Sequence, residues 1–414
     1  MQENRKVIIV GFQTGENDRF RYEMNELKEL ARSCDLEVVA EFSQKGEQVY
    51  PNHYFGSGKT LELKELLEEK EVDTIVCNDE LSPSQLQNIE KVLDCEIIDR
   101  TMLILEIFAS RARTKEALLQ VEISTLQYSL PRLNGAHANL GRQGGGFGLR
   151  NRGSGETKLE LSRRQIEKRI HKCQMALKEL VLERKTQRKR RDGSGLKTVA
   201  VVGYTNAGKS TLINQLVNQV EEKKVYVEDK LFATLETRVR HVELVEDYAC
   251  LITDTVGFVD KLPHYLIKAF RSTLEEVKEA DLLLHVVDIS NPNYLLQMET
   301  TIKTLAEIGV EDIPMIEVYN KIDLMEELYS EIDGKIYLSA QSGEGINTLK
   351  VELTKQLYGD YQESKFLFPY EMASTVSRLS DFYPIISTEH KENGIEICLN
   401  VPKNIQDKYL NYKV

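Results

Sequence analysis

The stretch Gly203-Tyr-Thr-Asn-Ala-Gly-Lys-Ser210 decides the fold of this chain of 414 residues. It fits the eight-residue pattern of a glycine-rich phosphate-binding loop. The apolar, β-branched run Lys197–Val202 before it predicts a buried strand, and a helix is expected to begin near Lys209. Glycines let backbone N–H groups surround a β-phosphate, and the helix N-terminus adds partial positive charge. The stretch therefore predicts a P-loop nucleotide-binding domain of the α/β class.

A second motif, Asp254-Thr-Val-Gly257, begins at the last residue of an apolar strand that we expect over Tyr248–Asp254. A carboxylate at this place can hold Mg²⁺ through water. Gly257 can offer its N–H to a γ-phosphate, a contact that is lost on hydrolysis. In the first motif, Lys209 can reach the β- and γ-phosphate oxygens, and Ser210 can place its hydroxyl on Mg²⁺.

Two later motifs predict that the base is guanine. Asn320-Lys-Ile-Asp323 follows the expected strand Met315–Tyr319, and Ser339-Ala340 follows Lys335–Leu338. The Asp323 carboxylate can accept two hydrogen bonds from the N1 and N2 edge of guanine. Adenine lacks that donor pair and would leave the charge unpaired, so discrimination is expected to be large. A backbone N–H at Ser339–Ala340 can serve guanine O6. The ligands predicted are GTP and GDP with Mg²⁺, and the reaction is GTP hydrolysis.

A second hydroxyl for Mg²⁺ is expected between the first two motifs. Thr234 is the candidate and Thr237 the competitor. The predicted catalytic residues are Lys209, Thr234 and Gly257, and the predicted metal ligands are Ser210, Thr234 and Asp254. The predicted nucleotide-binding residues are Gly203, Tyr204, Thr205, Asn206, Ala207, Gly208, Lys209, Ser210, Thr211, Phe232, Ala233, Thr234, Leu235, Glu236, Asp254, Thr255, Val256, Gly257, Asn320, Lys321, Ile322, Asp323, Ser339 and Ala340.

The residue after Gly257 departs from the best-known GTPases. Many of them have a glutamine there that positions the attacking water, whereas this chain has Phe258. Phenylalanine cannot orient water. The chain is therefore either slow alone or helped by another group, in itself or in a partner. His264 is close enough in sequence to be a base, but a surface or packing role suits it better.

Composition and charge limit the class of protein. The chain is 41% apolar and 29% charged, and its six cysteines form no CxxC pair. Such cysteine usage suits a reducing cytosol and predicts no zinc site. No run approaches the roughly 20 apolar residues of a membrane span, and the N-terminus lacks the apolar core of a signal peptide. A cytoplasmic protein is expected.

The net charge of −12 hides one strongly basic segment. Residues 151–191 hold 14 Lys and Arg against 5 Asp and Glu, a local charge of +9, which leaves −21 for the rest of the chain. A basic segment on an acidic body is typical of a local contact with a polyanion, although a solvated helix face is the alternative.

The remaining chain divides by pattern into three regions. Residues 1–100 alternate strand-like and helical stretches, which predicts a small parallel α/β domain. Residues 101–195 show two helical stripes at four-three spacing, which predicts an antiparallel hairpin. Its tip, about residues 131–156, is rich in glycine and carries Arg142, Arg150 and Arg152, the candidate contacts to RNA. The P-loop domain then spans residues 196–358, and a short α+β module residues 359–414.

The segment Gly56-Ser-Gly-Lys-Thr60 imitates part of a P-loop. The full pattern needs glycine at position 53, where this chain has His53, and no clear strand precedes it. A structural turn is favoured over a second nucleotide site.

Several stretches together resemble the HflX family of ribosome-associated GTPases, over nearly the whole chain. They are Tyr54–Thr60, Arg142–Gly148, Gly153–Glu160, Gly203–Ser210, Leu231–Glu236 and Asp254–His264. Ser154 and Lys158 stand where the family pattern leads us to expect Pro and Gln, which puts the details of the loop tip in question. A hydrophobic residue at Phe258 belongs to the family pattern.

The resemblance implies a cytoplasmic GTPase that binds the large ribosomal subunit and splits stalled ribosomes under stress. We expect the protein to be a monomer. The resemblance also implies that the ribosome stimulates hydrolysis and that the loop at 131–156 reaches toward the peptidyl-transferase centre. Some relatives protect ribosomes from antibiotics bound near that centre. The alternatives are a GTP-gated RNA-binding or assembly scaffold that never splits ribosomes, a GTPase of tRNA modification, and an ATP-driven RNA remodeller that uses Gly56–Thr60.

Overall fold

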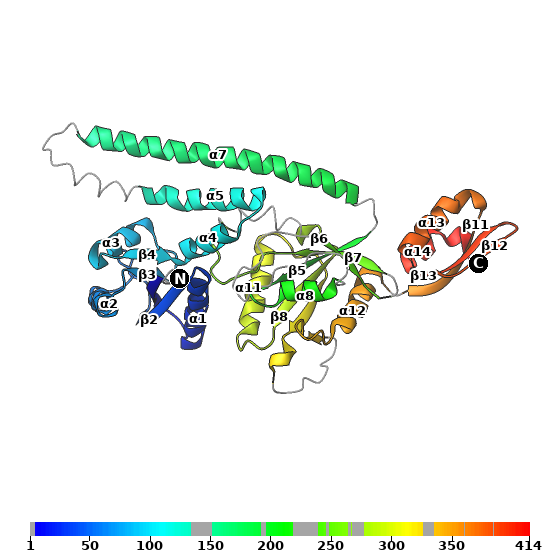
Figure 1. The fold of residues 1–414 in the computed structure, drawn as a ribbon, viewed down its shortest axis with the longest axis horizontal. Helices are drawn as coiled ribbons and strands as arrows, with labels where there is room; N and C mark the ends of the chain where they lie inside the picture. The colour runs from blue at the N-terminus through cyan, green and yellow to red at the C-terminus, as the bar shows by residue number, and fades with distance from the viewer. Residues whose placement is uncertain are drawn as a thin grey trace. The chain divides into compact units, whose positions relative to one another are not determined.

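The computed structural model describes residues 5–133, 151–191, 196–217, 239–245, 248–263, 266, 277–325, 335–359, 361–383 and 385–414. The described residues fall into two compact units (Figure 1). The first holds the chain up to Lys185 together with the short segment that begins at Phe258. The second holds the residues from Thr186 onward, apart from that segment.

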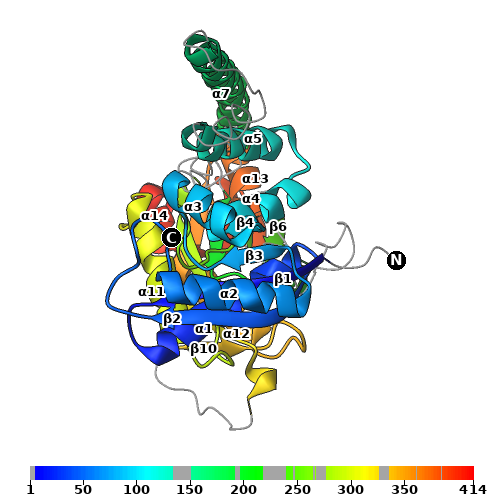
Figure 2. The same ribbon diagram turned by 90° about the vertical axis from the view of Figure 1, so that its left-hand side faces the viewer.

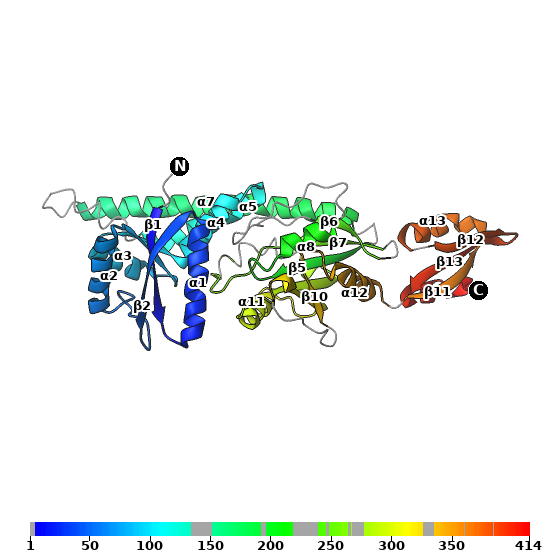
Figure 3. The same cartoon turned by 60° about the horizontal axis from the view of Figure 1, so that its bottom comes forward.

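The first unit is built on a four-stranded, all-parallel sheet of order β2-β1-β3-β4. Helices lie on both of its faces (Figure 3), with an apolar core between β1, β3, α2 and α3. The strands are β1 (Arg5–Gln13), β2 (Leu36–Lys45), β3 (Thr74–Cys77) and β4 (Glu96–Asp99), and the helices are α1 (Asn17–Ser33), α2 (Ser57–Lys70), α3 (Pro83–Leu93) and α4 (Arg100–Arg111). This confirms the parallel α/β domain. Sequence reasoning missed α4, whose almost continuous apolar run has no clear amphipathic period.

Two antiparallel helices follow: α5 (Lys115–Ser129), with the turn η1 (Leu130–Arg132) after it, and α7 (Asn151–Arg191). The first unit includes α5 and α7 as far as Lys185. Figures 1 and 2 show α5 alongside α7. Arg169 of α7 donates to Glu122 of α5 from Nη2 at 3.0 Å, and Cys173 is buried on the same side. The hairpin is therefore confirmed. Because α7 already begins at Asn151, it includes Gly153 and Gly155, which we expected in the loop; a long helix tolerates isolated glycines at roughly 1 kcal/mol each.

The second unit contains a six-stranded sheet of order β10-β9-β8-β5-β7-β6, parallel except for β6. Helices α8 and α12 pack on one face, and α11 contacts β5 and β8. The strands are β5 (Lys197–Gly203), β6 (Val239–Glu243), β7 (Ala249–Asp254), β8 (Leu282–Asp288), β9 (Met315–Asn320) and β10 (Ile336–Leu338), and the helices are α8 (Lys209–Leu216), α11 (Tyr294–Glu307), η3 (Ile322–Leu324) and α12 (Ile346–Tyr358). This is the predicted P-loop domain, and the loops at the carboxyl ends of its strands are where ligands bind in such sheets.

The C-terminal residues form a three-stranded antiparallel sheet of order β11-β13-β12. Phe366 and Phe368 of β11 are fully buried with Ile397 of β13. The elements are β11 (Tyr361–Phe368), η4 (Tyr370–Met372), α13 (Ala373–Phe382), β12 (Ile385–Lys391), β13 (Gly394–Pro402), α14 (Lys403–Lys408) and η5 (Leu410–Tyr412). Strands β12 and β13 form a hairpin that turns near Gly394, which suits the predicted α+β module.

Among the helices that the structure describes, none has both the length and the apolar character needed to cross a membrane.

Candidate nucleotide-binding site

The loop between β5 and α8 has a backbone that requires glycine at two positions. Gly203 has φ +148°, and a Cβ there would lie 2.3 Å from the carbonyl oxygen of Val286. Gly208 has φ +90°, and a Cβ there would lie 2.2 Å from Nδ2 of Asn320. Side chains at these positions would collide with backbone or with a buried amide, so the loop conformation explains both glycines.

Lys209, the first residue of α8, points back over this loop. Its Nζ donates to the carbonyl oxygens of Gly203, at 3.1 Å, and Tyr204, at 2.6 Å. The residue is only 7% exposed, and burial lowers the pKa of its ammonium group to about 8 against the opposing effect of Asp254. Carbonyl dipoles do not neutralise the charge of a buried ammonium group, so this group can still attract phosphate oxygens.

The residues expected to hold Mg²⁺ are brought together. Ser210 Oγ donates to Oδ2 of Asp254, which is buried at the end of β7, at 3.2 Å. Thr205, in the same loop, has a buried hydroxyl oxygen with no partner among the described residues. A hydroxyl and a carboxylate are hard oxygen donors of the kind that Mg²⁺ prefers. The oxygens and the glycine cradle therefore fit a magnesium–nucleotide complex.

Gly257 lies directly against the phosphate-binding loop. A Cβ at this position would come within 2.9 Å of Thr205 Cγ2 and 3.0 Å of Lys209 Nζ. A side chain here would require Thr205 or Lys209 to shift. The next side chain, Phe258, is buried at 3% exposure and, being apolar, offers no group that could orient water.

Asn320 joins the two loops expected to bind the base and the phosphates. Its Nδ2 donates to the Ala207 carbonyl at 2.8 Å, and its Oδ1 accepts from the Ala340 N–H at 2.9 Å. Lys321 has φ +70° and forms an ion pair with Asp288 at 2.8 Å. Asp323 is exposed, so its carboxylate is open to a base edge.

One expected contact differs in the structure. The Ala340 N–H, suggested for guanine O6, donates to Asn320, and the Ser339 N–H donates to the Glu344 carbonyl at 3.0 Å. Both amides are engaged because the loop after β10 folds back on itself. A contact from Ala340 to guanine O6 would need a shared hydrogen bond or a shift of this loop.

Part of the predicted site lies outside the described residues. This applies to Thr234 and its neighbours Phe232, Ala233, Leu235 and Glu236, to the competitor Thr237, to His264, and to Arg142 and Arg150. Arg152 lies in α7, but its side chain is not among those described.

The stretch Gly56–Thr60 forms the start of a helix and makes several polar contacts within its own domain. Gly56 caps α2, its N–H donates to Gln44 Oε1 at 2.9 Å, and Thr60 Oγ1 donates back to the Gly56 carbonyl at 3.0 Å. Lys59 forms an ion pair with Glu62. These contacts favour the structural turn over a second phosphate site.

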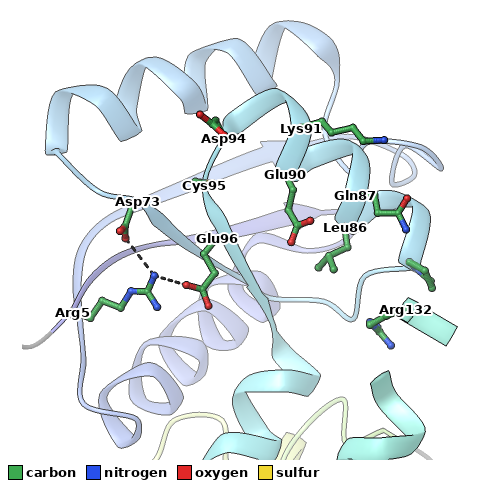
Figure 4. A pocket seen from close by; sticks show the side chains of 11 residues that line it. Arg5, Asp73, Leu86, Gln87, Glu90, Lys91, Asp94, Cys95, Glu96 and Arg132 are labelled. Carbon is green, nitrogen blue, oxygen red and sulfur yellow. Dashed lines mark hydrogen bonds and ion pairs between the residues drawn. The ribbon is translucent and has the colours of Figure 1, made fainter. Parts of the chain in front are cut away.

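A cleft of about 760 Å³ opens in the N-terminal domain (Figure 4). Arg5 pairs there with Glu96 and, at 3.5 Å, with Asp73. Four carboxylates face three cations across it: Asp73, Glu90, Asp94 and Glu96 against Arg5, Lys91 and Arg132. An excess of carboxylates does not suit the phosphates of a nucleotide, so the P-loop remains the candidate site.

Sequence reasoning missed two residues that matter near the site. Asp288 is the last residue of β8 and forms an ion pair with Lys321. A carboxylate at the end of an apolar strand is a sequence feature that could have identified it. Arg100 contacts the segment after Gly257, but it lies about 160 positions earlier in the chain, and no local pattern connects the two.

Comparisons with known proteins cover almost the whole chain. Three family models match: one described as GTP-binding GTPase N-terminal over residues 21–109, one as GTP-binding GTPase Middle Region over 111–191, and one as 50S ribosome-binding GTPase over 198–321. GTPase HflX of Caldanaerobacter subterraneus subsp. tengcongensis is 43% identical over 411 residues, 99% of this chain and 94% of that protein. GTPase HflX of Escherichia coli is 36% identical over 397 residues, 94% and 92% of the two chains.

A solved structure is also similar: a GTP-binding protein of Sulfolobus solfataricus in complex with GDP, 21% identical, with a TM-score of 0.44 over 85% of this chain and 98% of that one. This weaker match adds nothing to the family assignment. The identities over nearly full length, together with a P-loop domain that has the required glycines, place the chain in the HflX family of GTPases, with a nucleotide-binding domain of the ribosome-binding GTPase type.

Proposed function

We propose that this GTPase binds the large ribosomal subunit and splits stalled ribosomes under stress, and that the ribosome stimulates its GTP hydrolysis. The observation that carries the proposal is the buried Phe258 directly after Gly257. A site with no water-positioning side chain at this place needs another group, and a ribosomal partner can supply or reposition one. The family membership supports the choice of the ribosome as that partner.

Within the site, the chain's own residues bind and orient the nucleotide. The amides of Gly203–Gly208 and the ammonium of Lys209 would hold the phosphates, and Asp323 would select guanine. Ser210, Asp254 and Thr234 would hold Mg²⁺, which when bound neutralises charge on the β- and γ-phosphates. Gly257 would offer its N–H to the γ-phosphate and lose that contact on hydrolysis, which would release the protein from the ribosome.

The RNA-binding part of the proposal rests on α7 and the loop before it. Lys168, Lys172 and Lys178 are exposed on α7, and no ion pair is found for them among the described residues. Arg142, Arg150 and Arg152 would extend this basic surface at the tip. Exposed, unpaired cations in a row are suited to phosphate backbones.

The first experiment is GTP turnover by the purified protein, alone and with titrated large subunits or whole ribosomes. Strong stimulation by large subunits, absent in Lys209→Ala, is the expected result. Appreciable turnover alone with no stimulation would place the missing catalytic group within this chain and contradict the proposal.

Splitting is tested separately, by light scattering of whole ribosomes mixed with the protein and a non-hydrolysable GTP analogue. One round of splitting is expected, because binding energy does the work and hydrolysis only releases the protein. Binding to free large subunits with no loss of whole ribosomes would favour the assembly scaffold. Release of a labelled antibiotic from the peptidyl-transferase centre would support a role in protecting ribosomes from antibiotics. Sedimentation of the free protein would test whether it is a monomer.

A further inference from the structure

One buried hydroxyl in the phosphate-binding loop has no hydrogen-bond partner. Thr205 is 5% exposed, and its Oγ1 makes no hydrogen bond to any residue that the structure describes. Among the buried hydroxyl groups of the described ranges, it is the one left in this state. A buried polar group without a partner costs free energy, so its presence needs a physical explanation.

Other buried threonines of the same domain pair their hydroxyl groups with the protein. Thr255 Oγ1 donates to the Val201 carbonyl at 2.5 Å, and Thr354 Oγ1 donates to the Lys350 carbonyl of α12 at 2.8 Å. Each bond satisfies a group that is shielded from water. The unpaired hydroxyl of Thr205 is therefore a property of its place in the loop and not of the domain in general.

The loop forms a tight turn with Thr205 at its second position. The Ala207 N–H donates to the Tyr204 carbonyl at 3.4 Å, so Thr205 and Asn206 are the two central residues. Asn206 has φ +58°, a positive value of the kind that the third residue of a type II turn requires. The Tyr204 carbonyl also accepts from Lys209. Backbone groups and Lys209 therefore form the turn without the Thr205 hydroxyl.

Two groups expected at the γ-phosphate lie beside Thr205. A Cβ built on Gly257 would come within 2.9 Å of Thr205 Cγ2, and within 3.0 Å of both Thr205 Cα and Lys209 Nζ. Thr205, the Lys209 ammonium group and the Gly257 backbone therefore border one small space. The unpaired hydroxyl is bonded to the same carbon as the methyl group that faces Gly257, so it lies at the edge of that space.

A terminal phosphoryl group has the chemistry that these three groups would bind. Lys209 would neutralise part of its charge, and the Gly257 N–H would donate to one of its oxygens. A hydroxyl can donate one further hydrogen bond, and phosphate oxygens are strong acceptors. GDP has no γ-phosphate, and its β-phosphate is served by the loop amides in either nucleotide. A hydroxyl contact at the γ-phosphate therefore adds affinity for GTP alone.

We propose that the Thr205 hydroxyl donates a hydrogen bond to a γ-phosphate oxygen and so helps the site to prefer GTP over GDP. The proposal rests on the proposed nucleotide site. It gives a task to a position that the loop pattern leaves variable, since that pattern requires only two glycines, a lysine and a serine or threonine. It also explains the unpaired group, which is satisfied when GTP is bound.

The test compares the dissociation constants of GDP and of a non-hydrolysable GTP analogue for the full-length protein with Mg²⁺. Thr205→Val keeps the methyl group and removes the hydroxyl, so it should weaken the analogue about tenfold or more and change GDP by less than about twofold. Thr205→Ser, which keeps the hydroxyl, should retain most of the preference. Thr354→Val, at a buried threonine whose hydroxyl bonds to its own helix, is the matched control and should change neither constant.

Thermal unfolding without nucleotide separates a ligand contact from a structural role. Thr205→Val should unfold at a temperature no lower than the wild type, because the hydroxyl that it removes has no protein partner to lose. A clear fall in the unfolding temperature would show that the hydroxyl is bonded within the protein, and it would overturn the proposal.

The binding outcomes separate this proposal from the site on which it rests. Equal losses for both nucleotides in Thr205→Val would place the hydroxyl at a group that GTP and GDP share, and would overturn it. Unchanged constants for both would overturn it as well, with the site intact. Lys209→Ala should bind neither nucleotide, and normal binding by that variant would instead contradict the proposed site.

Discussion

Asn320 donates a hydrogen bond from its side-chain amide to the carbonyl oxygen of Ala207 at 2.8 Å. The same side chain accepts from Ala340, so one buried amide joins three loops that come from β5, β9 and β10. Base-binding and phosphate-binding parts of the site are therefore held at a fixed spacing without any nucleotide contact.

Asn320→Ala should weaken GDP binding by at least about tenfold and destabilise the domain by about 2–3 kcal/mol, because the Ala207 carbonyl and the Ala340 amide lose a buried partner. Titration calorimetry and urea unfolding measure the two effects. Gln356→Ala, which removes an exposed amide hydrogen bond on α12, is the control and should leave both unchanged. Full GDP affinity in Asn320→Ala would show that the spacing of the loops has other supports.

Asp323→Asn should change the base that is bound. An amide presents one acceptor and one donor, which match N1–H and O2 of xanthine instead of the two donors of guanine. We expect a loss of GTP affinity of about 100-fold or more and a preference for xanthosine triphosphate, measured by competition against a fluorescent nucleotide. Asp312→Asn, an exposed carboxylate in the same domain, is the control. Unchanged GTP affinity would exclude Asp323 from base recognition.

His285, buried in the middle of β8, should make the stability of the GTPase domain depend on pH. Burial lowers the pKa of its imidazole to about 4, below the usual 6.5 of the unfolded chain. The unfolded state thus binds more protons between these values, and stability falls as the pH falls from about 6.5 to 4.

Between about pH 7 and pH 5 this group should cost about 2 kcal/mol of unfolding free energy. His285→Leu should lose that part of the pH dependence, and His241→Gln, at an exposed histidine of β6, should keep it. Urea unfolding at the two pH values measures both. Equal pH dependence in the wild type and in His285→Leu would contradict a neutral, buried histidine.

Lys168→Glu/Lys172→Glu on α7 should weaken binding to large subunits by about tenfold or more at moderate salt and make it less salt-dependent, because fewer counterions are released. Lys303→Glu/Lys355→Glu changes the net charge equally at exposed lysines of α11 and α12 and is the matched control. Co-sedimentation at several salt concentrations gives both quantities. Equal losses in the two double variants would indicate a general charge effect and no specific surface on α7.

The sequence alone predicted the parts of this protein that depend on short-range order. After a buried strand, the glycine spacing of Gly203–Ser210 predicts a phosphate-binding loop. The alternation of strand and helix in residues 1–100 is compatible with few arrangements other than a parallel sheet. Helical periodicity in the same way paired α5 with α7, since each stripe needs an apolar partner. Element ends were less certain, as the start of α7 shows, because glycine weakens a helix without forbidding it.

The tertiary structure alone decided which distant groups meet. Nothing local to Asn320 indicates that its amide reaches Ala207, and nothing local to Arg100 or Lys261 indicates that both hold the segment after Gly257. Hydrogen bonds and ion pairs act over about 3 Å, whereas these partners are separated by up to 238 positions in the chain. Periodicity and motif spacing report a residue's own strand or helix, and only the packing of those elements brings the charges together.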